Sequence, residues 1–521
     1  MTTDSKSRRP DADHAARPMI TASIMLATIM QTLDSTIANV ALPHMAGGLS
    51  ASQDQITWVL TSYIVAAAIA TPVTGWVSGR FGRKTVFLAS IAGFTISSLL
   101  CGMAGNLPEI VVARLLQGVF GAALVPLSQA IMLDINPPER HARAMALWGM
   151  GVMLGPILGP TLGGWLTDNE SWRWVFLINL PLGALALIGV YRFVGETRAS
   201  TPSRFDWFGF SMLAVAIGML QLLLDRGEQA DWFESIEIRL EAVCAIVACT
   251  FFVLHTATDG DESFFNKALL KDRNFVTGLA FYFLLGLLLY ATRALLPSML
   301  ETLLGYPVTT TGLVTAPTGI GTMVAMLFAG RLVGRIDSRL IVALGFGLTA
   351  SSLWSMSCYT PQITTWDVAW PGFVQGLGLG FTSVPLITMT FSTLARRLRP
   401  EGTAIYSLSR NIGSSIGISV MQTLMVRNTV IMHSSLAAQI TPKALQAGSV
   451  AAALAGGPGA MAGLNEVLNT QASFIAYLDD FRLMFWMTLF AIPCLWLMRT
   501  REGEREPPGL EEEAETAPML E

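Results

Sequence analysis

Fourteen stretches of this sequence are apolar over roughly the 20 residues that a helix needs to cross about 30 Å of hydrocarbon. A segment inside a bilayer must satisfy its own backbone hydrogen bonds, so each stretch is predicted to be a helix. Only 13% of the residues are charged, against about a quarter in soluble domains. We therefore predict an all-α membrane protein with spans near 19–42, 55–77, 85–104, 109–132, 143–166, 173–193, 207–224, 238–255, 275–297, 309–330, 339–358, 367–391, 402–424 and 481–498.

Lysine and arginine are concentrated in alternate connections between these stretches. Arg80, Arg83 and Lys84 follow the second stretch, and Arg396 and Arg397 follow the twelfth. Cytoplasmic connections of membrane proteins carry an excess of these residues, so this side is predicted to be cytoplasmic. An even number of spans then places both termini there as well.

Three landmarks of the first half of the chain recur in the second half, at offsets of 255, 258 and 258 residues. A near-constant offset predicts two parallel half-repeats of six helices each, with room for two further spans between them. The landmarks and their counterparts are 75–84 with 330–339, Gln117 with Gln375, and Gly155 with Gly413.

The repeat divides the chain into five parts. The residues after the last span are polar and acidic, a composition typical of disorder. The predicted parts are a cytoplasmic N-terminal tail over 1–18, an N-terminal six-helix bundle over 19–195, two inserted membrane helices over 196–260, a C-terminal six-helix bundle over 261–500 with a long outer loop over 425–479, and a disordered cytoplasmic tail over 501–521.

A run of glycines lies in the fifth stretch, at Gly151, Gly155, Gly159 and Gly163. Residues four apart share one face of a helix, so this face has almost no side chains and another helix can lie directly against it. Pro156 removes a backbone donor inside the span and predicts a bend. The spacing alone leaves open whether the run serves only tight packing.

Asp34 lies in the middle of the first span. An unpaired carboxylate inside a bilayer costs several kcal/mol, so such a residue usually faces a cavity or titrates. Asp34 is therefore the best candidate for carrying a proton. The alternative is a structural carboxylate that accepts hydrogen bonds from serine or threonine.

Arg114 is a second charge inside a span, and Gln117 lies one turn further along the same helix face. We expect the Arg114 guanidinium to respond to the charge of the substrate and of the proton, as a coupling residue. The alternative is a side chain that extends to the cytoplasmic membrane surface.

Other polar residues inside the spans are candidates for a substrate cavity. Arg410 is predicted to line a central cavity with Asn411 beside it, whereas Arg293 is expected at the outer membrane surface. A lipid-facing position is an equal alternative for Tyr290. The cavity candidates are Gln31, Asn39, Gln117, Tyr290, Gln375, Arg410 and Asn411.

The connection 75–84 places several cations at the cytoplasmic membrane surface. They anchor this side of the protein, and they also predict a latch in which cations cap the carbonyl ends of helices and stabilise one access state. The gating candidates are Gly75, Arg80, Gly82, Arg83 and Lys84.

The sequence carries no pattern of a cofactor site. The five cysteines include no CxxC pair, the five histidines are scattered, and "GRKT" at 82–85 lacks the spacing of a phosphate loop. We expect no metal, no cofactor, no ATP hydrolysis and no enzymatic activity.

Five motifs together resemble one family. The segments 34–43, 75–84, 114–118, 151–164 and 172–181 are similar to motifs of the fourteen-span drug:proton antiporters of the major facilitator superfamily, and "LDRGEQADWF" resembles the EmrB-type permeases in particular. One position departs from the family pattern, because Gly79 stands where the connection motif usually has an acidic residue.

The resemblance implies a major facilitator fold and proton-driven export of amphipathic drugs by alternating access across the bacterial inner membrane. It implies Asp34 as the protonation site, Arg114 as the coupling residue, Gly155 and Pro156 as a central helix contact, and the proton gradient as the energy source. Implied partners are small amphipathic substrates, the lipid bilayer, a periplasmic adaptor protein and an outer-membrane channel of the TolC type, with no nucleic acid. Export of one specific metabolite, or a sensor or enzyme on a transporter scaffold, remains an alternative.

Overall fold

The computed structural model describes residues 10–195, 205–228, 230–258, 267–395, 398–438 and 458–498. Helices dominate these ranges, and within them the only β-type pairing is an isolated bridge between Val333 and Ile336. The N-terminal half comprises α1 (Pro10–Gly48), α2 (Gln53–Ile56), α3 (Trp58–Ala70), α4 (Val73–Phe81), α5 (Arg83–Met103), α6 (Leu107–Gly121), α7 (Leu124–Ile135), α8 (His141–Asn169), α9 (Trp174–Leu177) and α10 (Asn179–Phe193).

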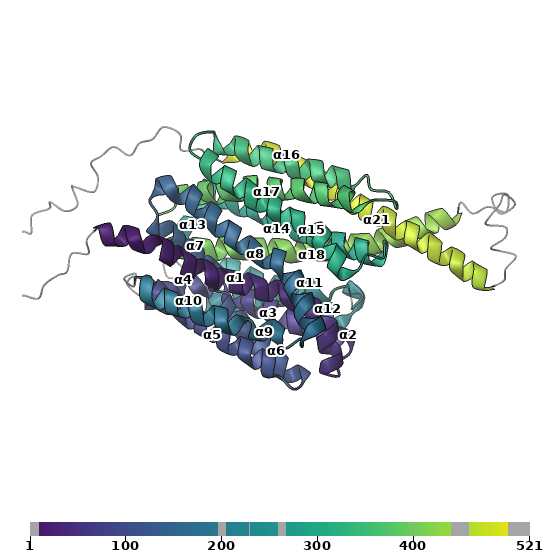
Figure 1. Cartoon of the computed structure of the whole chain (residues 1–521), viewed down its shortest axis with the longest axis horizontal. Helices are drawn as coiled ribbons and strands as arrows, with labels where there is room; N and C mark the ends of the chain where they lie inside the picture. Colours follow the sequence, from purple (N-terminus) through teal and green to yellow (C-terminus); the bar gives the residue numbers. More distant parts are fainter. Residues whose placement is uncertain are drawn as a thin grey trace, which may run out of the picture.

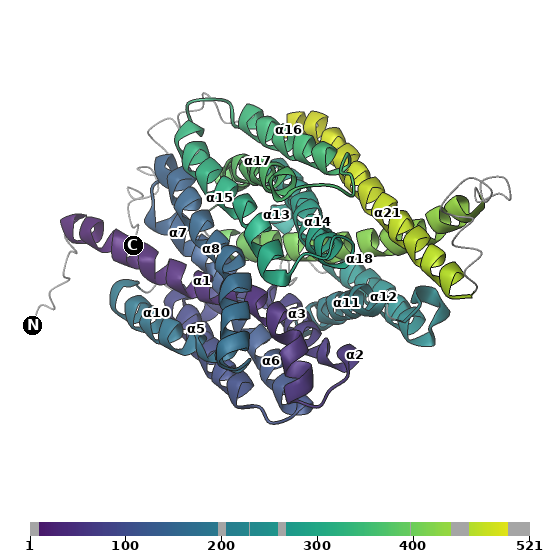
Figure 2. The same ribbon diagram turned by 45° about the vertical axis from the view of Figure 1, so that its right-hand side comes forward.

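Two helices connect this half to a second one. They are α11 (Trp207–Arg226) and α12 (Ile236–Thr258). Figures 1 and 2 show the two halves side by side, with the early helices in purple and blue and the late ones in green and yellow. The C-terminal half comprises α13 (Lys267–Lys271), α14 (Arg273–Thr302), α15 (Val308–Leu332), α16 (Ser338–Met356), α17 (Thr365–Ser392), α18 (Arg399–Ala438) and α21 (Pro458–Cys494).

Twelve of the described helical segments are long and apolar enough to cross a membrane. The pair α3 and α4, bent by 57° at Thr71 and Pro72, makes a thirteenth if it is counted as one span. The segment predicted over 402–424 lies in α18, which is not among them. The chain is a multi-pass membrane protein, and the count of fourteen spans stays a prediction.

Two predicted boundaries differ from the structure. The tail expected over 1–18 is partly helical, because α1 already begins at Pro10. The outer loop expected over 425–479 is wrong in large part, since α18 continues to Ala438 and α21 begins at Pro458. Both helices extend beyond the body of the molecule at one end (Figures 1 and 2). The tail predicted over 501–521 lies outside the described residues.

The glycine face of α8 lies against α1. A Cβ atom at Gly155 would come within 2.7 Å of the backbone nitrogen of Leu33, and one at Gly163 would come within 2.8 Å of the Ile37 side chain. The hydroxyl of Thr36 also donates a hydrogen bond of 3.2 Å to the carbonyl oxygen of Gly155. Because the two backbones approach so closely, α1 and α8 form one tight helix pair.

The second half repeats this packing. Gly413 in α18 lies against the backbone of α14, where a Cβ atom would come within 2.9 Å of the carbonyl carbon of Phe283. Likewise Gly118 of α6 lies against the backbone of α3, and Gly376 of α17 lies against that of α15. The glycines that recur in the sequence therefore hold equivalent helix pairs in the two halves.

The inserted helix α11 contacts both halves. Asp225 accepts a hydrogen bond from Thr61 of α3, and Gln221 accepts one of 2.9 Å from Ser415 of α18. Only 17% of the apolar window of α12 is buried, so α12 lies on the outside of this arrangement.

Candidate functional site

Asp34 is the centre of a buried polar cluster in the N-terminal half, and its side chain is 0% exposed. Its Oδ2 accepts a hydrogen bond of 2.7 Å from Nη1 of Arg114, and its Oδ1 accepts bonds from Gln117 (2.9 Å) and Asn179 (2.8 Å). Three helices, α1, α6 and α10, therefore converge on one carboxylate. We call Asp34, Arg114, Gln117 and Asn179 the Asp34 cluster.

Arg114 is 1% exposed and is held on several sides. Its Nε donates a hydrogen bond of 3.0 Å to the carbonyl oxygen of Val59 in the first turn of α3. The guanidinium lies 4.4 Å from the ring centre of Tyr63 and 5.6 Å from that of Phe176. A side chain extended to the membrane surface is excluded, so that alternative is wrong.

The sequence reasoning missed Asn179 as a site residue. Asn179 is fully buried and also donates to the hydroxyl of Ser98 at 3.0 Å, and Ser98 donates to the carbonyl oxygen of Phe176 at 2.9 Å. Two features of the sequence could have found it: Asn179 is a lone amide in an apolar span, and it lies inside the motif 172–181.

Two candidates on α1 lie outside the cluster. Gln31 is half-buried and donates a hydrogen bond of 2.9 Å to the hydroxyl of Tyr63, so it reaches the cluster indirectly. Asn39 is exposed and forms no part of the cluster.

An equivalent contact exists in the C-terminal half. Gln375 of α17, 5% exposed, donates a hydrogen bond of 3.2 Å to the hydroxyl of Thr292 on α14. Gln375 also lines a cavity of about 20 Å³, between apolar side chains of α14, α16 and α17. This contact contains no charged group.

Arg293 of the C-terminal half contacts the N-terminal half. Arg293 is half-buried, and its Nη2 contacts the sulfur of Met153 on α8 at 3.9 Å. The expected position of Arg293 at the outer surface is therefore wrong, because α14 continues for nine residues beyond it, to Thr302. Tyr290, whose ring centre lies 5.9 Å from the Arg293 guanidinium, faces the same interface.

Arg410 of α18 lies on the same side of α14. Its Nη1 approaches the hydroxyl of Tyr282 at 3.5 Å, and its Nη2 approaches Oδ1 of Asn411 at 3.4 Å. Its aliphatic stem covers Gly286, where a Cβ atom would come within 3.1 Å of it. Arg410 and Asn411 are both half-buried.

A cluster of charges joins the halves at the predicted cytoplasmic surface. Asp134, near the end of α7, forms an ion pair with Arg83 and lies 3.6 Å from Arg399 at the start of α18. Arg399 also donates to the carbonyl oxygen of Leu133 at 3.5 Å. The sequence did not predict a role for Asp134. Gly79 stands where the connection motif usually has an acidic residue, and here Arg83 pairs instead with Asp134, an acid on another helix.

The other residues of the connection 75–84 have separate roles. Lys84 donates a hydrogen bond of 2.8 Å to the carbonyl oxygen of Tyr191 near the end of α10, which is the kind of helix capping expected for this loop. Arg80 is exposed and stacks on Trp76 at 5.5 Å. Gly82 has a φ of +89°, a conformation that favours glycine and turns the chain from α4 into α5.

The halves also touch through backbone at these ends. A Cβ atom at Gly75 of α4 would come within 2.8 Å of the Cα atom of Glu401 on α18. Its counterpart Gly330 of α15 lies against Ala142 and Ala146 of α8. The predicted cytoplasmic ends of the two halves are therefore in contact in this conformation.

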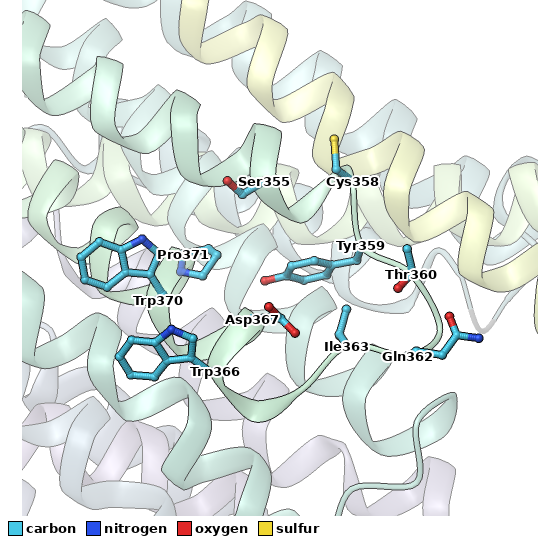
Figure 3. A pocket seen from close by; sticks show the side chains of 10 residues that line it. All are labelled: Ser355, Cys358, Tyr359, Thr360, Gln362, Ile363, Trp366, Asp367, Trp370 and Pro371. Carbon is cyan, nitrogen blue, oxygen red and sulfur yellow. The ribbon is translucent and has the colours of Figure 1, made fainter.

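A larger pocket lies apart from these clusters, at the connection between α16 and α17. It has a volume of about 440 Å³, and Figure 3 shows Tyr359 and Asp367 side by side within it. Burial raises the pKa of Tyr359, whose hydroxyl has no hydrogen-bond partner among the described residues. Trp366 and Trp370 are exposed at its edge, a position typical of aromatic residues at a membrane surface. None of its lining residues belongs to the Asp34 cluster.

The Asp34 cluster pairs a buried carboxylate with a buried guanidinium. An ionised Asp34 accepts three hydrogen bonds and neutralises Arg114, whereas a protonated Asp34 can do neither fully. Removing one partner of a buried ion pair costs about 3–5 kcal/mol, so the carboxylate and the guanidinium each depend on the other. In the described part of the chain no group of three or more His, Cys, Asp or Glu residues could hold a metal ion.

Two halves of equivalent helices around an interface, with a buried charged cluster in mid-membrane, define a secondary transporter of the major facilitator type. The family model of the Major Facilitator Superfamily matches residues 24–418, and the chain belongs to this superfamily. The major facilitator fold predicted from the sequence is thereby confirmed.

Named relatives are export and resistance proteins. The chain is 37% identical over 426 residues to the multidrug export protein EmrB of Escherichia coli K12, which covers 81% of this chain and 83% of the relative. It is 36% identical over 496 residues to the fatty acid resistance protein FarB of Neisseria gonorrhoeae, which covers 94% and 97%. The resemblance to EmrB-type permeases is thus confirmed.

Solved structures share the fold at low sequence identity. The human organic anion transporter MFSD10 (TETRAN) superposes with a TM-score of 0.59 at 14% identity, over 92% of this chain and 100% of that chain. A double tryptophan mutant of XylE gives a TM-score of 0.59 at 14% identity, over 93% and 96%.

Proposed function

We propose that this protein exports amphipathic drugs or other toxic compounds across the bacterial inner membrane, in exchange for protons and by alternating access. The observation that carries the proposal is the fully buried pair of Asp34 and Arg114 in a membrane span. The similarity to the multidrug export protein EmrB supports export as the direction of transport. The proton gradient supplies the energy, and no cofactor is required.

The proton competes with Arg114 for one carboxylate. A proton on Oδ2 of Asp34 takes the place of the hydrogen bond from Nη1 of Arg114. The guanidinium then keeps its bonds to Val59 and Gln117 but loses its counter-charge. Proton binding therefore changes the charge around Arg114 by one unit, which is the basis for coupling to a substrate.

The glycine contact between α1 and α8 supports a mechanical connection from the Asp34 cluster to the contact between the two halves at their predicted cytoplasmic ends. Asp34 lies on α1 next to Leu33, whose backbone touches Gly155 of α8. At its other end α8 touches Gly330 of α15 in the second half. Since the backbones of α1 and α8 are in contact, a shift of α1 moves α8 and with it the contact between the halves.

The energy source and the substrate range are tested together in proteoliposomes with an imposed pH gradient. We expect amphipathic drugs of several chemical classes to induce a proton flux, and Asp34→Asn to abolish it while the protein remains inserted. A flux with one defined metabolite alone would replace drug export by a specific exporter. Drug binding without any flux would overturn the proposal.

We propose the partners from the family resemblance of the sequence alone. EmrB-type permeases are expected to work with a periplasmic adaptor and an outer-membrane channel of the TolC type. Affinity purification of the full chain from the bacterial envelope tests this, and recovery of the permease without an adaptor after mild cross-linking would count against it.

A further inference from the structure

The pocket between α16 and α17 contains a polar group that the described part of the protein does not satisfy. Tyr359 is 7% exposed, and its hydroxyl has no hydrogen-bond partner among the described residues. Figure 3 shows this hydroxyl directed toward the part of the pocket where Asp367, Trp366 and Trp370 lie. Because burial raises the pKa of Tyr359, the hydroxyl keeps its proton and can donate it to an acceptor. A buried donor without a partner is costly, so this one is expected to bind a molecule that enters the pocket.

Asp367 gives the pocket a negative charge. Its Oδ2 accepts hydrogen bonds from the backbone nitrogen of Thr364 (2.8 Å) and from the hydroxyl of Thr364 (2.7 Å), which hold the carboxylate in place and stabilise its charged form. Asp367 forms no ion pair with any residue that the structure describes. The other residues that line the pocket are uncharged. The pocket therefore attracts a cation and repels an anion.

The walls of the pocket are held by hydrogen bonds within the protein. The hydroxyl of Ser352 on α16 donates to the carbonyl oxygen of Pro371 on α17 at 2.6 Å, which joins the two helices below the pocket. In the connection between them, the backbone nitrogen of Ile363 donates to the carbonyl oxygen of Thr360 at 3.2 Å. The pocket is thus formed before a ligand binds, and its volume of about 440 Å³ lies within the range of ligand sites.

A strip of aromatic rings leads away from the pocket along α17. Trp366 and Trp370 stack with ring centres 6.2 Å apart, and Trp370 stacks on Phe373 at 5.8 Å. Residues at this spacing share one helix face, and the strip extends about 10 Å along the helix axis. Both tryptophans are exposed, at the end of the helix that is predicted to lie at the outer membrane surface. The pocket therefore opens at the depth of the lipid head groups, and the strip follows the helix toward the middle of the membrane.

A ligand that satisfies all these features has three parts. It brings a cation for Asp367, an acceptor for the hydroxyl of Tyr359 and an apolar chain for the aromatic strip. A lipid head group with an ammonium next to a phosphate combines the first two, and an acyl chain supplies the third. An anionic lipid without an ammonium would be repelled by Asp367. A quaternary ammonium has no N–H group to donate to the carboxylate, whereas a primary ammonium has three.

We infer that this pocket binds the head group of phosphatidylethanolamine, with the ammonium on Asp367 and the phosphate on the hydroxyl of Tyr359. Charge-assisted hydrogen bonds from the primary ammonium to the carboxylate make this lipid bind more tightly than phosphatidylcholine. The inference goes beyond the proposed export function and does not depend on it. The pocket lies apart from the Asp34 cluster, and the test measures the binding of lipid, not transport.

Native mass spectrometry of the full chain tests the preference for the head group. The protein in detergent is titrated with phosphatidylethanolamine and with phosphatidylcholine of the same acyl chains, and the dissociation constants of the first bound lipid are compared. A hydrogen bond to a charged group corresponds to about tenfold in affinity, so we expect phosphatidylethanolamine to bind about tenfold more tightly. Equal dissociation constants would overturn the inference.

Two conservative substitutions assign the preference to the pocket. Asp367→Asn removes the charge and Tyr359→Phe removes the hydroxyl, and each should weaken the binding of phosphatidylethanolamine several-fold. The hydroxyl of Tyr359 has no partner in the described part of the chain, so Tyr359→Phe should leave the melting temperature of the lipid-free protein unchanged. This second measurement separates lost binding from misfolding. Wild-type affinity in both variants would place the lipid elsewhere and overturn the inference.

Two residues outside the pocket provide matched controls. Asp479 is a partly exposed carboxylate of α21, 3.9 Å from Arg482, and Tyr306 is a half-buried tyrosine in the connection between α14 and α15. Neither of them lines the pocket. Asp479→Asn and Tyr306→Phe should bind phosphatidylethanolamine as the wild type does. If they weakened binding as much as Asp367→Asn and Tyr359→Phe, the preference would not belong to this pocket and the inference would fall.

Two competitors determine whether the whole lipid is recognised. Glycerophosphoethanolamine has the head group without acyl chains, and dodecylammonium has a primary ammonium and an apolar chain without a phosphate. Each is added to the complex of the wild-type protein with phosphatidylethanolamine. We expect neither to displace the lipid at an equal concentration, because each lacks one of the three contacts. Displacement by dodecylammonium would assign the pocket to organic cations in general, and displacement by glycerophosphoethanolamine would assign it to a free head group. Either result would overturn the assignment to a lipid.

Discussion

The two halves of the molecule have the same helix pairs but different polar centres. In the first half Gln117 donates a hydrogen bond to the carboxylate of Asp34, and in the second half Gln375 donates one to the hydroxyl of Thr292. Asp34 and Thr292 are 258 positions apart in the sequence, and so are Gln117 and Gln375. The same geometry thus holds a titratable group in one half and a neutral group in the other.

The remaining partners differ in the same way. Asn179 of α10 donates a hydrogen bond to Asp34, whereas Met484 of α21 accepts a weak hydrogen bond of 3.8 Å from Thr292. Position 372 in α17, which corresponds to Arg114, is occupied by glycine. Of these two equivalent contacts, the one in the first half therefore contains a buried ion pair, and the one in the second half contains only neutral groups.

Replacing Asp34 with asparagine should have the largest effect. Asp34→Asn preserves the shape of the side chain but removes the titrating charge and leaves Arg114 without a counter-charge, at a cost of about 3–5 kcal/mol. Drug export against a gradient should fall to background in proteoliposomes, and the melting temperature should also decrease. Export at the wild-type proton ratio would show that the two halves do not differ in the way described.

Replacing Gly155 with alanine should have the next largest effect. The new Cβ atom would lie 2.7 Å from the backbone nitrogen of Leu33, and backbone cannot move aside as a flexible side chain does. Inserting an extra carbon atom into a tightly packed contact costs about 1–3 kcal/mol. We therefore expect the yield of folded protein and the transport rate to fall several-fold.

Two glycines of the same helix provide controls. A Cβ atom at Gly151 would meet the flexible end of Met25, and one at Gly164 would meet nothing within 4 Å. Gly164→Ala should be neutral and Gly151→Ala mild, with transport measured at equal protein levels. Equal effects of all three substitutions would show that contact with α1 is not what makes Gly155 sensitive.

The helices and the repeat were predictable because hydropathy, loop charge and glycine spacing are local properties of the sequence. The contacts of Asp34 were not, because Asn179 is 145 residues away and only the fold brings the two together. Asp134 was missed for the same reason, since its pairing with Arg399 joins the two halves.

Other errors have different physical causes. The position of Arg293 was wrong because α14 continues to Thr302, five residues beyond the predicted end of its span, so Arg293 lies further from the helix end than the sequence indicated. The loop over 425–479 was wrong because helices that continue beyond a membrane span need no apolar signature. α18 continues in this way up to Ala438, and α21 begins at Pro458, well before the predicted last span. Hydropathy predicts where a chain crosses the membrane, not where its helices end.

The two equivalent glutamines should respond unequally. Gln117→Ala removes a hydrogen bond to a charged group, worth about 1.5–3 kcal/mol, whereas Gln375→Ala removes one between neutral groups, worth about 0.5–1.5 kcal/mol. Thermal unfolding of the two variants in the same lipid measures the difference. An equal loss of stability would mean that Asp34 is uncharged in the state that unfolds.

Replacing Thr292 with valine should have the smallest effect of all. Valine keeps the branched shape and fills the same volume, and it removes only a neutral hydroxyl that bonds Gln375, Met484 and the carbonyl oxygen of Leu288 within its own helix. The amide of Gln375 then loses a weak partner, so we expect a loss of at most about 1 kcal/mol of stability and proton flux near the wild-type level. Thr292→Val and Asp34→Asn are therefore matched substitutions at equivalent positions, and their ratio of transport activities measures how unequal the halves are. If Thr292→Val abolished proton flux as Asp34→Asn should, the neutral contact of the second half would be part of the proton path, and the division of roles between the halves would have to be abandoned.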